Sequence, residues 1–163
     1  MTVNPAPQIF GLNFEAEAGT ITAPFVSSGG SISQPSESGL NDGGRAAYSF
    51  NVTSAGNYQV EMSVNAPSEA NNSVFVNIDA EPQDPSMVWH IPVTAGTENR
   101  VVSWQGAGTY DAPQFVPKTF TLTAGTHQLI VRGREGGVAI NSISVVKQVE
   151  LPEPPSNLRV TTN

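Results

Sequence analysis

Apolar and polar side chains alternate along most of the chain with a period of two residues. The clearest example is 58–64, in which Tyr58, Val60, Met62 and Val64 fall on one face and polar side chains on the other. This is the period of a β-strand with one buried face. Similar runs lie at 10–17, 21–26, 45–52, 73–79, 100–104, 115–122, 127–132 and 138–147. Because no segment has a convincing 3.6-residue period, the pattern predicts an all-β fold, an antiparallel β-sandwich (jelly roll) of about nine or ten strands.

Two short turns and four long loops organise the predicted strands. Ala55-Gly56 and Ala124-Gly125 each separate two strand-like runs, which is typical of hairpins. Antiparallel strands reverse direction, so placing these turns at one end of the sandwich sends the long loops to the other end. This placement of the long loops requires that 80–98 adds no full strand. A strand at the run 87–91 would break that condition. The long loops, where binding residues are usually found, are 27–44, 66–72, 105–114 and 133–137.

Composition narrows the possible partners. The 163 residues carry a formal net charge of −7 with only seven Lys and Arg, which argues against nucleic acid and against anionic membrane surfaces. There is no Cys, so disulfides and thiolate chemistry are excluded, although secretion is not. No run of about 18 apolar residues occurs, so we expect no membrane insertion.

The two ends of the chain differ from its middle. Residues 1–8 have the character of a leader or linker, and we place the main domain at 9–148. Residues 149–163 form a Pro-rich linker followed by Ser156-Asn157-Leu158-Arg159-Val160, which resembles the opening strand of a fibronectin type III domain. The alternative is a disordered tail. The first interpretation implies a module, monomeric by itself, within a multidomain chain.

Glu15 and Glu17 are candidate metal ligands. On a strand, residues at i and i+2 lie on one face, so the two carboxylates would repel each other unless a cation lies between them. Calcium takes six to eight oxygen ligands and suits such a pair. From spacing alone, two solvated glutamates on an edge strand explain the pattern at least as well.

Five segments in order resemble carbohydrate-binding modules of families 6 and 35, over residues 13–147. They are Phe14-Glu15-Ala16-Glu17, the strand 43–52 with Ala55-Gly56-Asn57-Tyr58, the strand 72–79, the strand and turn 120–129, and the segment 134–143 that opens with Arg134-Glu135-Gly136-Gly137. The resemblance implies a β-sandwich with a structural Ca2+ held by Glu15, Glu17 and Asn141. Family members usually carry Asp at the position of Asn141, so we expect a weakened site that is still able to bind calcium.

The same resemblance places the sugar at the loop end, where an aromatic ring stacks on the pyranose and polar groups bind its hydroxyls. The candidate carbohydrate-binding residues are Trp104, Tyr110, Asn71, Asn72, Arg134 and Glu135. Each has a structural alternative. Trp104 would be a core residue, the two asparagines would make a turn, and Arg134 and Glu135 would pair with each other.

The sequence therefore predicts a non-catalytic, polysaccharide- or oligosaccharide-binding module of an extracellular or cell-surface bacterial protein. A structural spacer or adhesion domain is the main alternative. A small polysaccharide-active enzyme is the least favoured, because His90 and His127 have the pattern of ordinary strand histidines and no catalytic motif is present. With few basic residues, we expect the sugar to be neutral or bound through calcium. The sequence does not identify the sugar.

Overall fold

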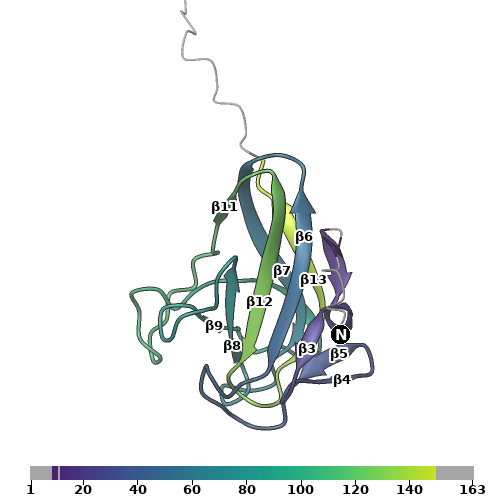
Figure 1. The fold of residues 1–163 in the computed structure, drawn as a ribbon. Coiled ribbons are helices and arrows are strands. Elements are labelled where there is room, and N and C mark those ends of the chain that lie inside the picture. Colours follow the sequence, from purple (N-terminus) through teal and green to yellow (C-terminus); the bar gives the residue numbers. More distant parts are fainter. Residues whose placement is uncertain (1–8, 11, 150–163) are drawn as a thin grey trace, which may run out of the picture.

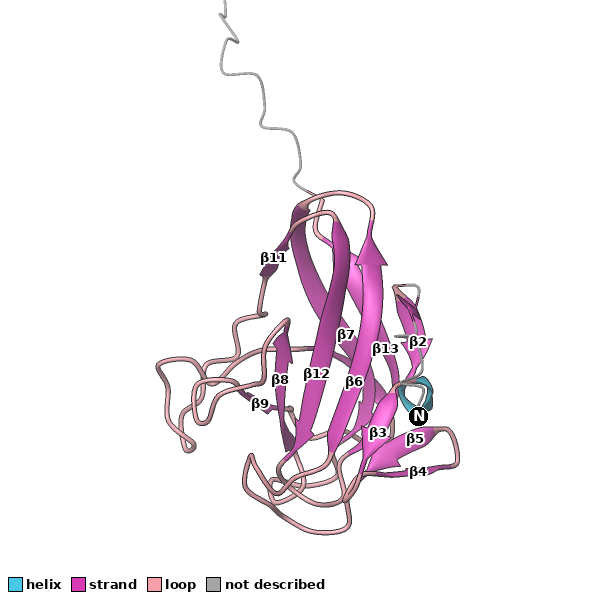
Figure 2. Ribbon diagram, viewed as in Figure 1, coloured by secondary structure: helices cyan, strands magenta, loops and turns pink. Residues whose placement is uncertain are grey.

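The computed structural model describes residues 9, 10 and 12–149, which form two β-sheets packed face to face (Figure 1, Figure 2). The elements, in chain order, are β1 (Ile9–Phe10), β2 (Asn13–Glu15), the 3-10 turn η1 (Ala16–Ala18), β3 (Thr20–Thr22), β4 (Val26–Ser28), β5 (Ser31–Ser33), β6 (Arg45–Val52), β7 (Gly56–Asn65), β8 (Ser73–Ile78), β9 (Val88–His90), β10 (Glu98–Val101), β11 (Phe120–Leu122), β12 (Gly125–Gly133) and β13 (Ala139–Lys147). The predicted all-β sandwich is confirmed. The residues outside the described part include 1–8 and 150–163, where we predicted a leader and a further domain.

Each sheet is named here after its central strand. The β12 sheet has the order β1-β6-β12-β8-β9, with β3 also paired to β6. The β13 sheet has the order β10-β7-β13-β5-β4, with β11 also on β7 and β2 on β13. Their facing sides form one core, to which β7 contributes its predicted face of Tyr58, Val60, Met62 and Val64. Burial of this face orients the β13 sheet, because a shift by one residue would expose all four side chains.

The strand count among the described residues is thirteen rather than nine or ten, because the runs 10–17 and 21–26 are each broken and because β5 and β9 lie outside the predicted runs. The run 21–26 divides at Pro24, which has no N–H to donate, into β3 and β4. The run 10–17 ends in η1, where the backbone turns beneath Tyr48, whose hydroxyl donates to Ala16 O (2.6 Å). Gly19 permits this approach, since a Cβ there would lie 2.4 Å from the Tyr48 ring.

The two Ala-Gly turns do lie at one end of the sandwich, as predicted, but they are not hairpins. β6 and β7 belong to different sheets, and so do β11 and β12, so each turn crosses from one sheet to the other. Alternation reports which face of a strand is buried and says nothing about which strand lies beside it. The hairpin interpretation was therefore wrong, although the turn positions were right.

The opposite end, hereafter the loop end, is built from three arches that also cross between sheets. Residues 34–44 join β5 to β6, 66–72 join β7 to β8, and 134–138 join β12 to β13 (Figure 1). The loop 105–114 does not belong with them. β10 and β11 both pair antiparallel with β7, one after the other along it. Residues 102–119 are therefore a long loop that leaves the β13 sheet after β10 and returns to the same side of β7 at β11, hereafter the excursion. The predicted position of this loop was wrong because β9 supplies an additional strand within 80–98. Within the described part of the chain, no helix has the length and apolar composition needed to span a bilayer.

His127, on β12 near the Ala-Gly end, contacts the residues that follow β8 and β11. Its Nδ1 lies 2.6 Å from Asp79 Oδ2 and its Nε2 lies 2.7 Å from Thr123 O. Both partners are acceptors, so only the protonated ring can donate to both. Burial lowers the pKa of His127, but the hydrogen bonds to Asp79 and Thr123 and the Asp79 charge outweigh it, and the pKa lies above the ordinary 6.5.

We expect His127→Gln to lose more stability in acid than in base. A raised folded-state pKa stabilises the fold fully below the unfolded pKa, and this contribution disappears as the pH rises through the folded-state pKa. The difference in unfolding free energy between wild type and variant should be larger at about pH 5.5 than at about pH 8.5 in urea titrations. A difference that is constant with pH, or that grows in base, would contradict the doubly hydrogen-bonded imidazolium.

Candidate functional site

One buried side chain ties two of the three arches together. Gln34 is only 2% exposed. Its Nε2 lies within hydrogen-bond distance of Ser36 O (2.8 Å), Ser38 Oγ (2.9 Å) and Arg134 O (3.2 Å), and its Oε1 accepts from Gly44 N (3.0 Å). Gln34 could not be singled out from the sequence, because one Gln in a Ser-rich loop has no distinguishing pattern. It fixes the 34–44 arch against the 134–138 arch.

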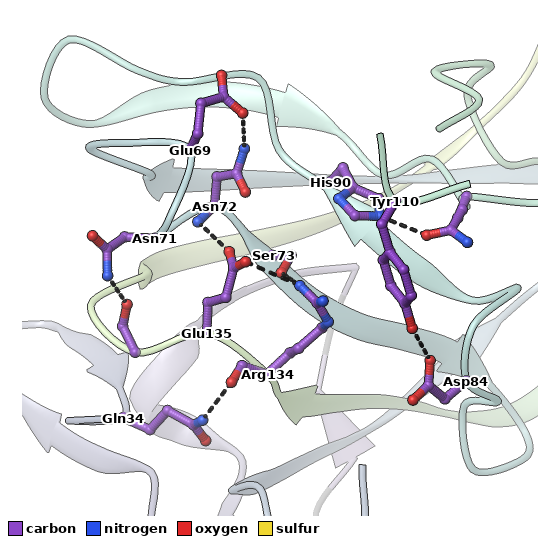
Figure 3. A network of polar contacts seen from close by, with 12 residues as sticks. Gln34, Glu69, Asn71, Asn72, Ser73, Asp84, His90, Tyr110, Arg134 and Glu135 are labelled. Carbon is purple, nitrogen blue, oxygen red and sulfur yellow. Dashed lines mark hydrogen bonds and ion pairs between the residues drawn. The ribbon is translucent and has the colours of Figure 1, made fainter. Parts of the chain in front are cut away.

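Arg134 and Glu135 form a second connection, shown in Figure 3. The Arg134 guanidinium donates to Ser73 Oγ (2.5 Å) and to Glu135 Oε1 (3.0 Å). The other Glu135 oxygen accepts from Asn72 N (2.8 Å). The side chains are 18% and 15% exposed, so this ion pair lies largely out of water. Their pairing, the structural alternative weighed from the sequence, is present, and it also joins the 134–138 arch to the start of β8.

The two predicted asparagines have different roles. Asn71 closes a turn with Ser68 and donates from Nδ2 to Gly136 O, so its amide is occupied by the fold. Asn72 is buried, but its side chain lines a pocket and donates from Nδ2 to Glu69 Oε2 (3.1 Å). Asn72 therefore contacts both the scaffold and the pocket.

Tyr110 reaches the loop end from the excursion, although the reasoning that placed it there was wrong. Its ring lies over the Arg134 guanidinium, with 4.9 Å between ring centroid and Cζ, and meets His90 edge to face at 6.0 Å. Its hydroxyl donates to Asp84 Oδ1 (2.7 Å), and this hydrogen bond is the largest of the effects that raise the pKa of Tyr110. Tyr110 is thus positioned from several sides yet remains 48% exposed.

Asn72 and Tyr110 border a pocket of about 230 Å³. Two of its lining residues are exposed aromatics, Tyr110 and Phe115, the latter 58% exposed. The lining consists of Glu69, Asn72, His90, Ile91, Pro92, Tyr110, Asp111, Ala112, Pro113 and Phe115. Phe115 was not predicted as a site residue because the pattern placed 115–122 in a strand. Pro113 and Pro117 flank Phe115 and were the available signal against a continuous strand.

Trp104 does not join Tyr110 in this pocket. It is partly buried against the core, donates from Nε1 to Val76 O (2.9 Å), and meets Phe120 edge to face at 5.8 Å. It lines a different hollow, because the excursion leaves the side of the sandwich and not its end. Trp89 is fully buried in the core.

The three predicted metal ligands come from neighbouring elements. Glu15 ends β2, where it pairs with Ser142, and Asn141 lies at the irregularity in β13 just before Ser142. Glu17 lies in η1 and not on the strand, and its Oε1 accepts from Gly30 N (3.2 Å). The i, i+2 strand argument for Glu15 and Glu17 was therefore wrong. Both carboxylates are exposed and form no ion pair among the described residues.

Comparison with known proteins identifies the fold. No protein-family model and no curated protein matches the sequence. Among solved structures, the C-terminal CBM6 of LamC, a marine laminarinase from Zobellia galactanivorans, has a TM-score of 0.56 at 20% identity, over 83% of this chain and 98% of that one. The CBM6 of Cellvibrio mixtus lichenase 5A, in complex with cellotriose, has a TM-score of 0.52 at 18% identity, over 84% and 97%.

A third similar structure is larger than this chain. The GH26-CBM35 β-(1,4)-mannanase of Podospora anserina has a TM-score of 0.56 at 12% identity, over 86% of this chain. The match spans only 28% of the mannanase. The chain therefore has the fold of carbohydrate-binding modules of the family 6 and family 35 type, as the sequence resemblance implied.

We expect Glu135→Gln to reduce the free energy of unfolding by about 1–3 kcal/mol, because it leaves the largely buried Arg134 without its carboxylate. Urea unfolding measures the change. Glu98→Gln is the control, since Glu98 pairs with Arg100 where both side chains are about one-third exposed, at 35% and 31%. The control should lose less than about 1 kcal/mol. Equal losses in the two variants would show that the Arg134–Glu135 pair has no special role.

Proposed function

We propose that the chain is a non-catalytic carbohydrate-binding module whose sugar occupies the pocket between Tyr110 and Phe115. The observation that carries the proposal is the pairing of two exposed aromatic rings with hydrogen-bonding groups held by the scaffold. Flat rings pack against the C–H faces of pyranoses, and amide, carboxylate and imidazole groups bind hydroxyls in fixed directions. The fold shared with modules of families 6 and 35, one of them complexed with cellotriose, supports the same reading.

The pocket chemistry favours an uncharged sugar. Glu69 and Asp111 both line it, while Arg134, the cation that contacts the Tyr110 ring, is paired with Glu135. An anionic sugar would bring its charge toward two carboxylates without gaining a free cation. A neutral sugar uses the same carboxylates as hydroxyl acceptors.

The role we propose is targeting. A module of this kind would hold a larger secreted or cell-surface protein, or a glycoside-active enzyme, on polysaccharide. The Pro-rich segment that follows residue 148 is consistent with a linker to another domain. The alternative, a spacer or adhesion domain without a sugar site, is less favoured because Tyr110 and Phe115 are exposed beside a pocket.

We further propose that Glu15, Glu17 and Asn141 hold a structural Ca2+. Two exposed carboxylates without a cationic partner and an amide oxygen at a strand irregularity are the donor types that calcium takes. Among the described residues, no group of three or more Asp, Glu, His or Cys gathers for a metal. The remaining ligands would be backbone oxygens or water. When bound, the ion would neutralise the two carboxylates and join η1 to β13.

We expect Tyr110→Ala and Phe115→Ala each to weaken sugar binding by about tenfold or more, because each removes roughly 1.5–3 kcal/mol of apolar contact from a closed ring–sugar interface. A panel of plant, algal and bacterial polysaccharides in affinity gels would first identify the ligand, and calorimetry would then measure the variants.

Val26→Ala is the matched control for these two variants, since Val26 is 55% exposed on β4 and does not line the pocket. It should bind as the wild type does. Folded variants that all bind equally would place the sugar elsewhere. A folded wild type that binds nothing across the panel would favour the spacer, and turnover of any polysaccharide would overturn the non-catalytic assignment.

For the proposed calcium site, we expect a chelator to lower the melting temperature by roughly 5 °C or more if calcium is otherwise present at about 100 times its Kd. Excess CaCl2 should restore it. Glu15→Gln should melt at the same temperature with and without chelator, whereas Glu61→Gln, a control on β7, should respond like the wild type. No chelator effect on the wild type would remove calcium from the proposal while leaving the sugar pocket untouched.

A further inference from the structure

A second hollow lies on the other side of the excursion. It has a volume of about 330 Å³ and is lined by Trp104, Gly106, Gln114, Val116, Pro117, Lys118 and Thr119. None of these residues lines the Tyr110–Phe115 pocket. Phe115 and Val116 are neighbours, yet one lines each hollow, so residues 102–119 separate the two hollows.

Trp104 provides a fixed aromatic surface in this hollow. Its indole N–H is bound to Val76 O, and its ring is held edge to face by Phe120 and packed on the core. The ring is nevertheless only partly buried and forms part of the hollow. A large ring already immobilised by the scaffold loses little side-chain freedom when a ligand binds to it.

Lys118 lies over this aromatic surface. Its backbone N–H donates to Val102 O (2.8 Å), which anchors the residue beside the end of β10. Its Nζ lies 4.1 Å from the Trp104 ring centroid and 5.5 Å from that of Phe120. No carboxylate in the described part of the chain forms an ion pair with Lys118, whereas Arg45, Arg100, Arg132 and Arg134 all have such partners.

The charge of the hollow is therefore the reverse of that of the first pocket. Its lining contains one cation and no carboxylate, while the first pocket contains Glu69 and Asp111 and no cation. An ammonium that rests on an exposed aromatic ring gains only about 0.5–1 kcal/mol from that contact. A ligand anion can therefore draw Lys118 from the ring at small cost, and the flexible four-carbon stem allows the movement.

We propose that this hollow is a second ligand site that binds a pyranoside carrying a carboxylate, that is, a uronic acid unit. The sugar ring packs on Trp104, and the carboxylate pairs with the Lys118 ammonium that it displaces. Gln114 and Thr119 are the other polar side chains able to meet hydroxyls. A neutral sugar must displace Lys118 without forming an ion pair, so the hollow discriminates in favour of the acid. This departs from the expectation that a chain with few basic residues binds only neutral sugars directly.

The test compares methyl β-D-glucuronide with methyl β-D-glucoside, which differ only in the carboxylate. The indole N–H of Trp104 is the reporter in NMR titrations, and that of the fully buried Trp89 is the internal reference. Trp104→Phe assigns the two signals, because these are the only tryptophans. We expect the glucuronide to shift the Trp104 signal, with an apparent affinity roughly twofold to fivefold above that of the glucoside and a preference that falls as salt rises.

Lys118→Met is the decisive variant, since it keeps an unbranched side chain to cover Trp104 and removes only the charge. The preference for the glucuronide should fall to about equality in this variant. Equal responses to the two sugars in the wild type, a preference that survives Lys118→Met, or no shift of the Trp104 signal would each overturn the proposal.

Tyr110→Ala separates this site from the first pocket. If the second site is independent, the variant keeps its glucuronide response at Trp104 although it loses the sugar of the first pocket. Loss of the Trp104 response in this variant would mean that the glucuronide binds beside Tyr110, which would overturn the proposal. Conversely, failure of every titration at Trp104 leaves the function proposed for the first pocket standing on its own polysaccharide panel.

Discussion

Each arch at the loop end crosses from one sheet to the other, and this crossing constrains everything built there. Backbone groups in an arch are not part of a strand ladder, so buried ones pair across to another arch, as Ser38 N does with Arg134 O and Gly137 N with Gln34 O, or with side chains. Gln34 bonds with backbone groups of Ser36, Gly44 and Arg134, and Glu135 accepts from the Asn72 N–H. Leaving such groups unpaired would cost about 1–3 kcal/mol each. These two polar side chains therefore hold the arches in one arrangement.

Holding the arches uses up residues that would otherwise be available to a ligand. Asn71 is occupied by the turn and by Gly136 O, and Arg134 by Ser73, Glu135 and the Tyr110 ring. What remains free lies on the excursion, whose side chains the arches do not need. Tyr110 has features of both the scaffold residues and the contact residues, because it is exposed while its hydroxyl and ring are both held in place. Five of the ten residues that line the pocket lie on the excursion, but Glu69 and Asn72 of the 66–72 arch line it as well, so scaffold and contact roles overlap on that arch.

Much of the fold could be predicted because alternation is a local signal. β6, β7, β12 and β13 lie close to where the pattern placed them, since each buries one face in the same core. Partner strands are a non-local property, and for this reason the Ala-Gly turns were misread as hairpins. Trp104 and Tyr110 were grouped into one site because they are six positions apart, yet the excursion between β10 and β11 directs them into different hollows. Gln34 and Phe115 acquire their roles only through residues distant in sequence.

The net charge of −7 is a poor guide to what any one hollow can bind. Charges more than about 10 Å apart are largely screened at physiological salt, so a ligand responds mainly to the groups that line its site. The arginines of the described part of the chain all form ion pairs with carboxylates, so the net charge of each hollow is set by the few residues that line it. Glu69 and Asp111 make one hollow acidic, and Lys118 makes the other basic. A polysaccharide that carries both neutral and acidic units would match the two sides of the excursion better than a homopolymer, because each side would favour the unit that the other side disfavours.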